Sequence, residues 1–243
     1  MADELHAFAL IAANWPYLLR GLQVTLLLSV FSLVGSTGLG AVFAMLRMSP
    51  LWWLRWPAVL YVDIVRMIPL VMVIFWIFFL IPILTGQAVL PVTTALIALI
   101  LFNTSYMAEV IRTGLQSVPR GLSEAARCSG MSYTQCMLRV VLPIAMRSML
   151  PALVSRLIAL IMGTSLASII GVTEFFRAAN DINNRLFLPY QIFALVGLVY
   201  FILSFSLSML GRALQRSLAA GERRSGKTAA PPLMQQVALT LDH

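Results

Sequence analysis

The longest polar interval between apolar runs extends from Glu109 to Pro143 and reads EVIRTGLQSVPRGLSEAARCSGMSYTQCMLRVVLP. The apolar runs before and after it each reach the roughly 20 residues that a helix needs to cross a bilayer. We therefore expect this interval to lie outside the lipid, between two membrane spans.

Cap residues inside the interval predict its local structure. Ser123 precedes a run of strong helix formers and can cap their first turn, and Gly130 can take the left-handed conformation that ends a helix. Ser132 and Gln135 have the spacing of a capping box, and Pro143 opens the next apolar run, where a missing amide is harmless. The sequence predicts a short surface helix, a glycine turn and a second helical segment.

The composition is that of an integral membrane protein. Of 243 residues, 60% are hydrophobic and 11% are charged, whereas soluble domains carry about 25% charged residues. This length suits an all-α bundle of five spans of about 20 to 25 residues each. The net charge of +8 is scattered over membrane-flanking loops, unlike a nucleic-acid surface. Cys128 and Cys136 lack metal-ligand spacing, so we expect free thiols.

Five apolar runs give the expected membrane spans. They cover residues 22–46, 57–84, 92–111, 145–172 and 189–210. Together they form one transmembrane domain, residues 22–212, in which residues 112–143 are the main loop. Residues 1–21 form a lead, and residues 213–243 form a basic tail whose composition predicts disorder.

Charge asymmetry predicts the orientation. Most of the 17 Lys and Arg residues lie in the first loop, the main loop and the tail. The opposite side holds only Arg20, Arg177 and Arg185. Because cytoplasmic loops carry the excess of basic residues, we expect the N-terminus outside and the C-terminus in the cytoplasm.

Small residues gather in the first expected span, at Gly35, Ser36, Gly38 and Gly40. Such a cluster allows two helices to approach closely. The alternative is that these glycines mark a break in the helix.

Two arginines lie within expected spans, where an ionised side chain costs about 2.5 to 3.5 kcal/mol near the bilayer centre. Arg66 lies three residues after Asp63, so a local ion pair is the alternative to a functional role. Arg156 has no acidic neighbour in sequence. For Arg156 we favour a role in ligand binding or in a pore over a structural partner such as Glu109.

Two polar segments interrupt the apolar runs. Gly163, Thr164 and Ser165 break the fourth span, either as an unwound stretch that meets substrate or as ordinary small-residue packing. Asn103, with its two hydroxyl-bearing neighbours, is interpreted as polar lining of the third span.

Sequence motifs give no sign of catalysis or of a cofactor. Residues 221–228, GERRSGKT, fit the phosphate-loop pattern, but a working loop joins a buried strand to a helix. Here the motif follows a membrane helix and runs into Ala-Ala-Pro-Pro. We expect no nucleotide and no metal on this chain, so any ATPase must be a separate subunit.

The main loop resembles the EAA loop of ABC importer permeases, whose pattern is E-A-A, three residues, G, a spacer and a final L-P. The matching positions are Glu124, Ala125, Ala126, Gly130, Leu142 and Pro143. The likeness to polar amino acid permeases of the histidine/glutamine type extends from Leu22 to Arg216. It includes GLQVTL at 21–26, RMIPL at 66–70, YMAEVIR at 106–112 and TSL at 164–166. The glutamate/aspartate import permeases are the subgroup it resembles most.

The resemblance implies a type I importer fold and a non-enzymatic subunit of a bacterial inner-membrane complex. Its partners would be two ABC ATPase subunits that hold ATP and Mg²⁺, a sister permease or a second copy, lipid, and a periplasmic amino-acid-binding protein. The main loop would be the coupling helix that contacts the ATPase. The residues implied in coupling are Gly121, Glu124, Ala125, Ala126 and Gly130.

The substrate hypothesis centres on Arg156, whose planar fork suits a carboxylate. Thr164 and Ser165 would add hydroxyls, with Arg66 and Asn103 as further candidates. This chain departs from the family at Gly163, where an Asp is common, and relatives often carry a neutral or acidic residue at the position of Arg156. The alternatives are a permease for glutamine or a basic amino acid, a secondary transporter or channel without an ATPase, and a scaffold that conducts nothing.

Overall fold

The structure is a computed structural model that describes residues 10, 12–87 and 90–225. All regular structure in this part of the chain is helical, as predicted. In chain order the elements are α2 (Trp15–Met48), α3 (Trp52–Met67), α4 (Leu70–Thr85), α5 (Pro91–Gln116), α6 (Arg120–Cys128), α7 (Tyr133–Cys136), the π-helical η1 (Met137–Val141), α8 (Leu142–Gly163), the 3-10 helix η2 (Thr164–Ile170), α9 (Phe175–Leu186) and α10 (Pro189–Ser225).

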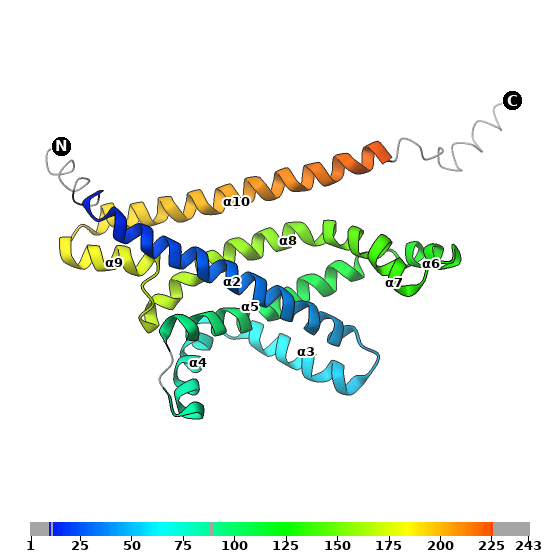
Figure 1. Cartoon of the computed structure of the whole chain (residues 1–243), viewed down its shortest axis with the longest axis horizontal. Coiled ribbons are helices and arrows are strands. Elements are labelled where there is room, and N and C mark those ends of the chain that lie inside the picture. Colours follow the sequence, from blue (N-terminus) through cyan, green and yellow to red (C-terminus); the bar gives the residue numbers. More distant parts are fainter. Residues whose placement is uncertain (1–9, 11, 88–89, 226–243) are drawn as a thin grey trace.

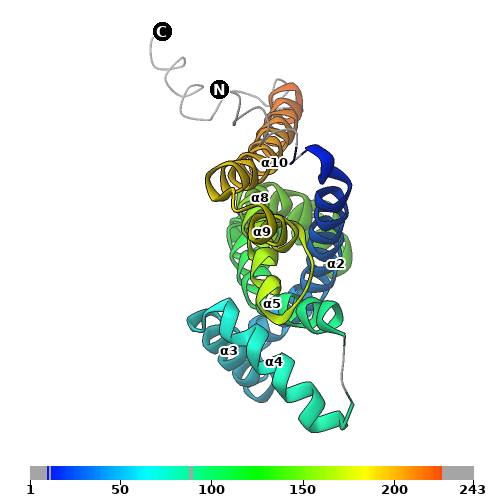
Figure 2. The ribbon, with the colours of Figure 1, turned by 90° about the vertical axis from the view of Figure 1, so that its left-hand side faces the viewer.

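Four long helices, α2, α5, α8 and α10, run along the long axis of the molecule (Figure 1). Helix α9 lies at one end, beside the start of α2, and the short helices α6 and α7 lie at the other end. Seen from the α9 end, α3 and α4 project to one side of the bundle (Figure 2). The bundle therefore has two distinct ends, one built by α9 and one by α6 and α7.

Helix α2 packs most extensively against α5. A Cβ atom on Gly40 would lie 2.5 Å from Met107 Cβ, and one on Gly35 would lie 2.9 Å from Ile100 Cδ1. Helix α2 continues unbroken through both glycines to Met48. Close helix packing, rather than a break, is thus confirmed at Gly35 and Gly40, whereas a Cβ on Gly38 would meet nothing within 4 Å.

Apolar residues form one core along the bundle and a second core at the α9 end. The first joins α2, α4, α5, α8 and η2, with Leu99 and Ile74 fully buried. The second packs α9 against the start of α2 and α10, around Phe175 and Ile182. Many large apolar side chains elsewhere stay exposed, which suits helices that face lipid or a partner subunit.

Four helical stretches of the described chain are long and apolar enough to cross a membrane. They are Trp15–Met48, Pro91–Gln116, Tyr133–Ile170 and Pro189–Ser217. The expected span 57–84 differs, because it consists of α3 and α4 with a bend of 111° between them. Pro69 has no backbone N–H and disfavours helical geometry in the residue before it, and Ile68 is extended, with ψ 136°. By length and composition, the described chain therefore has four candidate spans, or up to five if the bent pair counts as one.

Two helices extend past the expected bounds of the transmembrane domain. Helix α2 begins at Trp15, inside the expected lead, and α10 continues to Ser225, inside the segment expected to be disordered. The phosphate-loop match begins within α10, at Gly221. Its last residues, Gly226 to Thr228, and the rest of the expected tail lie outside the described residues.

Candidate functional site

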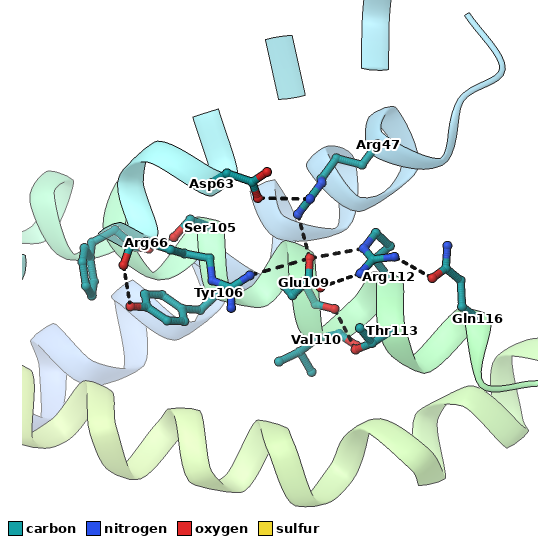
Figure 3. A network of polar contacts seen from close by, with 11 residues as sticks. Arg47, Asp63, Arg66, Ser105, Tyr106, Glu109, Val110, Arg112, Thr113 and Gln116 are labelled. Carbon is teal, nitrogen blue, oxygen red and sulfur yellow. Dashed lines mark hydrogen bonds and ion pairs between the residues drawn. The ribbon is translucent and has the colours of Figure 1, made fainter. Parts of the chain in front are cut away.

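A cluster of charged side chains surrounds Glu109 on α5 (Figure 3). Glu109 Oε2 accepts a hydrogen bond from Arg47 Nη1 of α2 at 2.7 Å, and Oε1 accepts one from Arg112 Nη2 at 2.5 Å. Arg66 Nη1 of α3 lies 3.8 Å from Oε2. Arg47 also donates to Asp63 Oδ1 at 3.2 Å. One carboxylate thus holds three helices together.

Burial makes this cluster more than a surface ion pair. The side chain of Arg47 is 10% exposed and that of Glu109 is 22% exposed. Removing one partner of such a pair leaves uncompensated charge, which costs far more than a surface salt bridge contributes. For Arg66 the sequence analysis offered the local pair with Asp63, whereas the ion pair of Arg66 is with Glu109, and Asp63 pairs with Arg47.

Arg156 of α8 lies against the aromatic ring of Tyr106. Its Cζ atom is 3.8 Å from the ring centroid, and Arg66 Cζ is 5.4 Å from the same centroid. Arg156 Nη2 donates to Asn103 Oδ1 at 3.1 Å, while its buried Nε has no acceptor. The structure therefore brings together three predicted site residues, Arg66, Asn103 and Arg156. Both arginines lie near the ring of Tyr106, a residue to which the sequence analysis assigned no role.

No carboxylate pairs with Arg156 among the described residues. Glu109, the structural partner considered from the sequence, is occupied by the other arginines. A cavity of about 380 Å³ is lined by Asp63, Arg66, Met67 and Tyr106. The guanidinium groups offer positive charge and hydrogen-bond donors to an anionic ligand, while the Tyr106 ring holds Arg156 through a cation–π contact.

The other two predicted site residues lie elsewhere. Thr164 is fully buried and its Oγ1 donates to the carbonyl of Ile161 at 2.7 Å. Ser165 Oγ donates to the carbonyl of Met162 at 2.7 Å. The break in the apolar run is real, because α8 ends at Gly163 and continues as the tighter η2, a change that often marks a hinge. Both hydroxyls nevertheless donate their hydrogen bonds to backbone carbonyls one turn earlier in the chain.

A second buried polar cluster, at the α9 end, was missed by sequence reasoning. Glu174 is fully buried and caps α9, since its carboxylate accepts from the amides of Phe176 at 2.8 Å and Arg177 at 2.7 Å. Thr25 of α2 and Tyr200 of α10 also donate to it. Burial raises the pKa of the Glu174 carboxyl above its usual range, and these four hydrogen bonds oppose that rise. An acidic residue directly before Phe-Phe was the available signal for this cap.

The main loop folds much as the sequence predicts. Gly130 has φ +84°, and the amides of Gly130 and Met131 bond to the carbonyls of Arg127 and Ala126, a Schellman ending. The capping box of Ser132 and Gln135 is present in full, which confirms the predicted start of α7.

One expected cap in the loop is wrong. Helix α6 begins at Arg120, after Pro119, so Ser123 lies inside the helix and its Oγ donates to the Arg120 carbonyl. Pro119, directly before the first turn, makes the helix begin earlier than the Ser123 hydroxyl suggested. Within α6, Glu124 and Ala125 are exposed, while Ala126 is 7% exposed and faces the rest of the molecule.

The coupling candidates thus lie on an exposed helix at one end of the bundle (Figure 1). Gly121 is exposed, with open space where a Cβ would stand. Both cysteines of this region are free, Cys128 exposed and Cys136 buried. The described residues contain no group of His, Cys, Asp or Glu side chains that could hold a metal ion.

Apolar helices of membrane length around a polar cluster, with a short exposed helix at one end, are the architecture of a multi-pass membrane protein. The chain matches the family model of the binding-protein-dependent transport system inner membrane component over residues 36–220. It belongs to this family, and the resemblance to ABC importer permeases is confirmed. The chain is therefore a transport subunit of a multi-pass membrane family, not a catalytic one.

Individual relatives agree with the family assignment. The chain is 36% identical over 216 residues to the glutamate/aspartate import permease protein GltK of Escherichia coli O6:H1, a match that spans 86% of this chain and 96% of the relative. It is 36% identical over 204 residues to the probable glutamine ABC transporter permease protein GlnP of Bacillus subtilis, spanning 82% and 92%. A crystal structure of an amino acid ABC transporter with histidines matches with a TM-score of 0.78 and 26% identity, spanning 85% of this chain and 96% of that one.

Proposed function

We propose that this chain is the permease subunit of an ATP-driven importer of polar amino acids and that glutamate and aspartate are its substrates. The observation that carries the substrate proposal is Arg156, a cation in a membrane-length helix with no carboxylate partner in the described part of the chain. Such residues mark substrate pathways, because an unpaired charge inside a membrane is costly. The likeness to GltK supports the same choice.

The geometry around Tyr106 supports a ligand with two carboxylates. Arg156 and Arg66 come from different helices and both lie near one ring, at 3.8 Å and 5.4 Å from its centroid. In this proposal Arg156 takes one substrate carboxylate in its fork, and Arg66 takes the other at the neighbouring cavity. Asn103 orients Arg156 through its hydrogen bond. Thr164 and Ser165 donate their hydroxyl hydrogens within their own helix, so in this proposal they would contribute only as hydrogen-bond acceptors.

A second substrate, glutamine, is favoured by one observation, the equal identity of 36% to GlnP. Glutamine carries a single carboxylate, so it would use Arg156 and leave Arg66 to its pair with Glu109. A basic amino acid suits the site less well, since it would bring a further cation beside two arginines.

The proposed mechanism is alternating access driven from outside the chain. Two ATPase subunits, which hold ATP and Mg²⁺, would contact Glu124 and its neighbours on α6 at the cytoplasmic face. A binding protein would deliver substrate at the opposite face of a bacterial inner membrane, and a sister permease or second copy would complete the path. Closure of the ATPases would move α6, and the bundle would switch between an outward-open and an inward-open conformation. Ligands would shift this equilibrium by binding one conformation more tightly than the other.

The test is uptake of labelled glutamate into proteoliposomes that contain the complete transporter, with and without its binding protein. Unlabelled aspartate, glutamine and arginine serve as competitors. The proposal predicts ATP-dependent uptake that aspartate blocks and arginine does not. Competition by glutamine would retain the importer and change its substrate, and flux without ATP would instead indicate a secondary transporter.

A further inference from the structure

A basic cavity of about 250 Å³ lies where α2 ends, α3 begins and α5 ends. Its lining consists of Arg47, Met48, Arg55, Val59, Arg112 and Gln116. Three of these six side chains are arginines from three different helices. The substrate proposal above uses none of the three.

The carboxylates nearby cannot neutralise this region. Glu109 pairs with Arg47, Arg66 and Arg112, and Asp63 pairs with Arg47. Arg55 is exposed and has no carboxylate partner in the described ranges. Three arginines therefore share two carboxylates and Arg55 has neither, which leaves an excess of positive charge.

The cavity walls are held in place before any ligand arrives. Arg112 is fixed on both sides, by Glu109 and by Gln116, whose Oε1 accepts from Nη1 at 2.6 Å. Arg47 is fixed by Glu109 and Asp63, and its buried Nε has no acceptor. These guanidinium groups are preorganised and keep N–H donors that carboxylates do not use. Such groups suit a phosphate, whose oxygens accept two parallel hydrogen bonds from one planar guanidinium.

Neighbouring aromatic residues indicate the depth of the cavity in a membrane. Trp52, Trp53 and Trp56 flank Arg55 in sequence and are 78%, 55% and 65% exposed. Tryptophan side chains concentrate where lipid headgroups meet the hydrocarbon core. The membrane-length helices α2 and α5 also end here, at Met48 and Gln116. The cavity thus lies at headgroup level.

We propose that this cavity binds the phosphate of an anionic phospholipid headgroup. Arg55 supplies the free cation, Arg47 and Arg112 form the walls, and the tryptophans pack beside the acyl chains. Basic pockets between membrane helices on the cytoplasmic side are suited to such headgroups. This site is separate from the amino acid path, because its arginines line a different cavity from that beside Tyr106.

The test uses the complete transporter, purified in detergent and stripped of lipid, with thermal unfolding as the readout. Phosphatidylglycerol, phosphatidylcholine and inorganic phosphate are added separately to wild type, Arg55→Gln and Arg216→Gln. Arg216 is an exposed arginine of α10 that does not line the cavity, so it controls for loss of charge. Mass spectrometry measures the phosphatidylglycerol that each variant retains.

We expect phosphatidylglycerol to raise the melting temperature of wild type more than phosphatidylcholine does. Arg55→Gln should lose at least about half of that difference and retain less lipid, whereas Arg216→Gln should match wild type. An equal response in Arg55→Gln and wild type would overturn the site. A response to inorganic phosphate as large as that to lipid would show a site for a free anion. Loss of bound ATPase from Arg55→Gln with an unchanged lipid response would show instead that Arg55 contacts the ATPase.

Discussion

The guanidinium of Arg156 lies 3.8 Å from the ring centroid of Tyr106, although the two residues are on different helices, α8 and α5. This contact and the hydrogen bond to Asn103 hold a cation that has no carboxylate partner in the described chain. An aromatic ring stabilises a cation without neutralising it. Arg156 therefore keeps its full charge for a ligand.

Replacing Tyr106 should weaken substrate binding through Arg156. A cation–π contact contributes about 0.5 to 2 kcal/mol, so Tyr106→Leu should raise the KM for glutamate by roughly 2- to 30-fold. Tyr106→Phe keeps the ring and loses only a hydroxyl whose hydrogen bond to the Arg66 carbonyl is long, at 3.5 Å. Its KM should stay near the wild-type value. Equal uptake kinetics in the two variants would remove Tyr106 from the site.

Two replacements of Arg156 should distinguish the contribution of its positive charge from that of its planar guanidinium group. Arg156→Glu should abolish uptake of acidic amino acids, while Arg156→Lys should keep some uptake at an affinity about 10- to 100-fold lower, since hydrogen bonds to charged groups contribute about 1.5 to 3 kcal/mol. Basal ATP hydrolysis of the purified complex shows whether each variant still assembles. Arg20→Glu, at an exposed position near the start of α2, is the control for reversed charge. Wild-type uptake by Arg156→Glu would refute the substrate hypothesis.

The carboxylate of Glu109 should matter more to stability than that of Asp63. Glu109→Gln leaves three arginines without their shared partner and should lower the free energy of unfolding by about 3 kcal/mol. Asp63→Asn loses a single ion pair at a side chain that is 45% exposed, so its effect should be smaller. Thermal unfolding of the two variants in the same detergent measures the difference. Equal melting temperatures would contradict the central role of Glu109.

Two glycines of α2 provide a matched test of helix packing. Gly40→Ala would place a Cβ 2.5 Å from Met107 Cβ and 3.0 Å from the Ala108 amide nitrogen. Overpacking of this kind costs about 1 to 3 kcal/mol. Gly38→Ala meets nothing within 4 Å and should be neutral or slightly stabilising, because alanine favours helix. If thermal unfolding gave the opposite order, the close approach of α2 and α5 would be refuted.

Charge reversal on α6 should uncouple ATP hydrolysis from transport. Glu124 is exposed, so Glu124→Lys should leave the fold intact while disturbing a contact with the ATPase. We expect hydrolysis that no longer responds to binding protein and substrate, together with reduced uptake. Asn184→Lys, exposed on α9 at the other end of the bundle, is the control. Normal stimulation of hydrolysis in Glu124→Lys would show that this side chain makes no coupling contact.

Local sequence signals predicted the features that depend on neighbouring residues. The capping box at Ser132 and the turn at Gly130 follow from short-range hydrogen bonds and from the left-handed freedom of glycine. Pro69 carried a similar local signal for the bend between α3 and α4, but the high overall hydrophobicity of residues 57–84 led to the prediction of one continuous span. Ser123 shows that a cap residue is ambiguous when a proline lies just upstream.

The sequence by itself determined the all-helical membrane class, the small-residue face of α2 and the family, because apolar length, residue size and motif spacing are properties of contiguous segments. Only the tertiary structure decided the partners of the charged side chains. Arg47 and Glu109 are 62 residues apart in the chain, and Thr25 and Glu174 are 149 apart. Buried polar groups take whichever partner the packing of helices brings within reach, and no pattern along the chain encodes that choice.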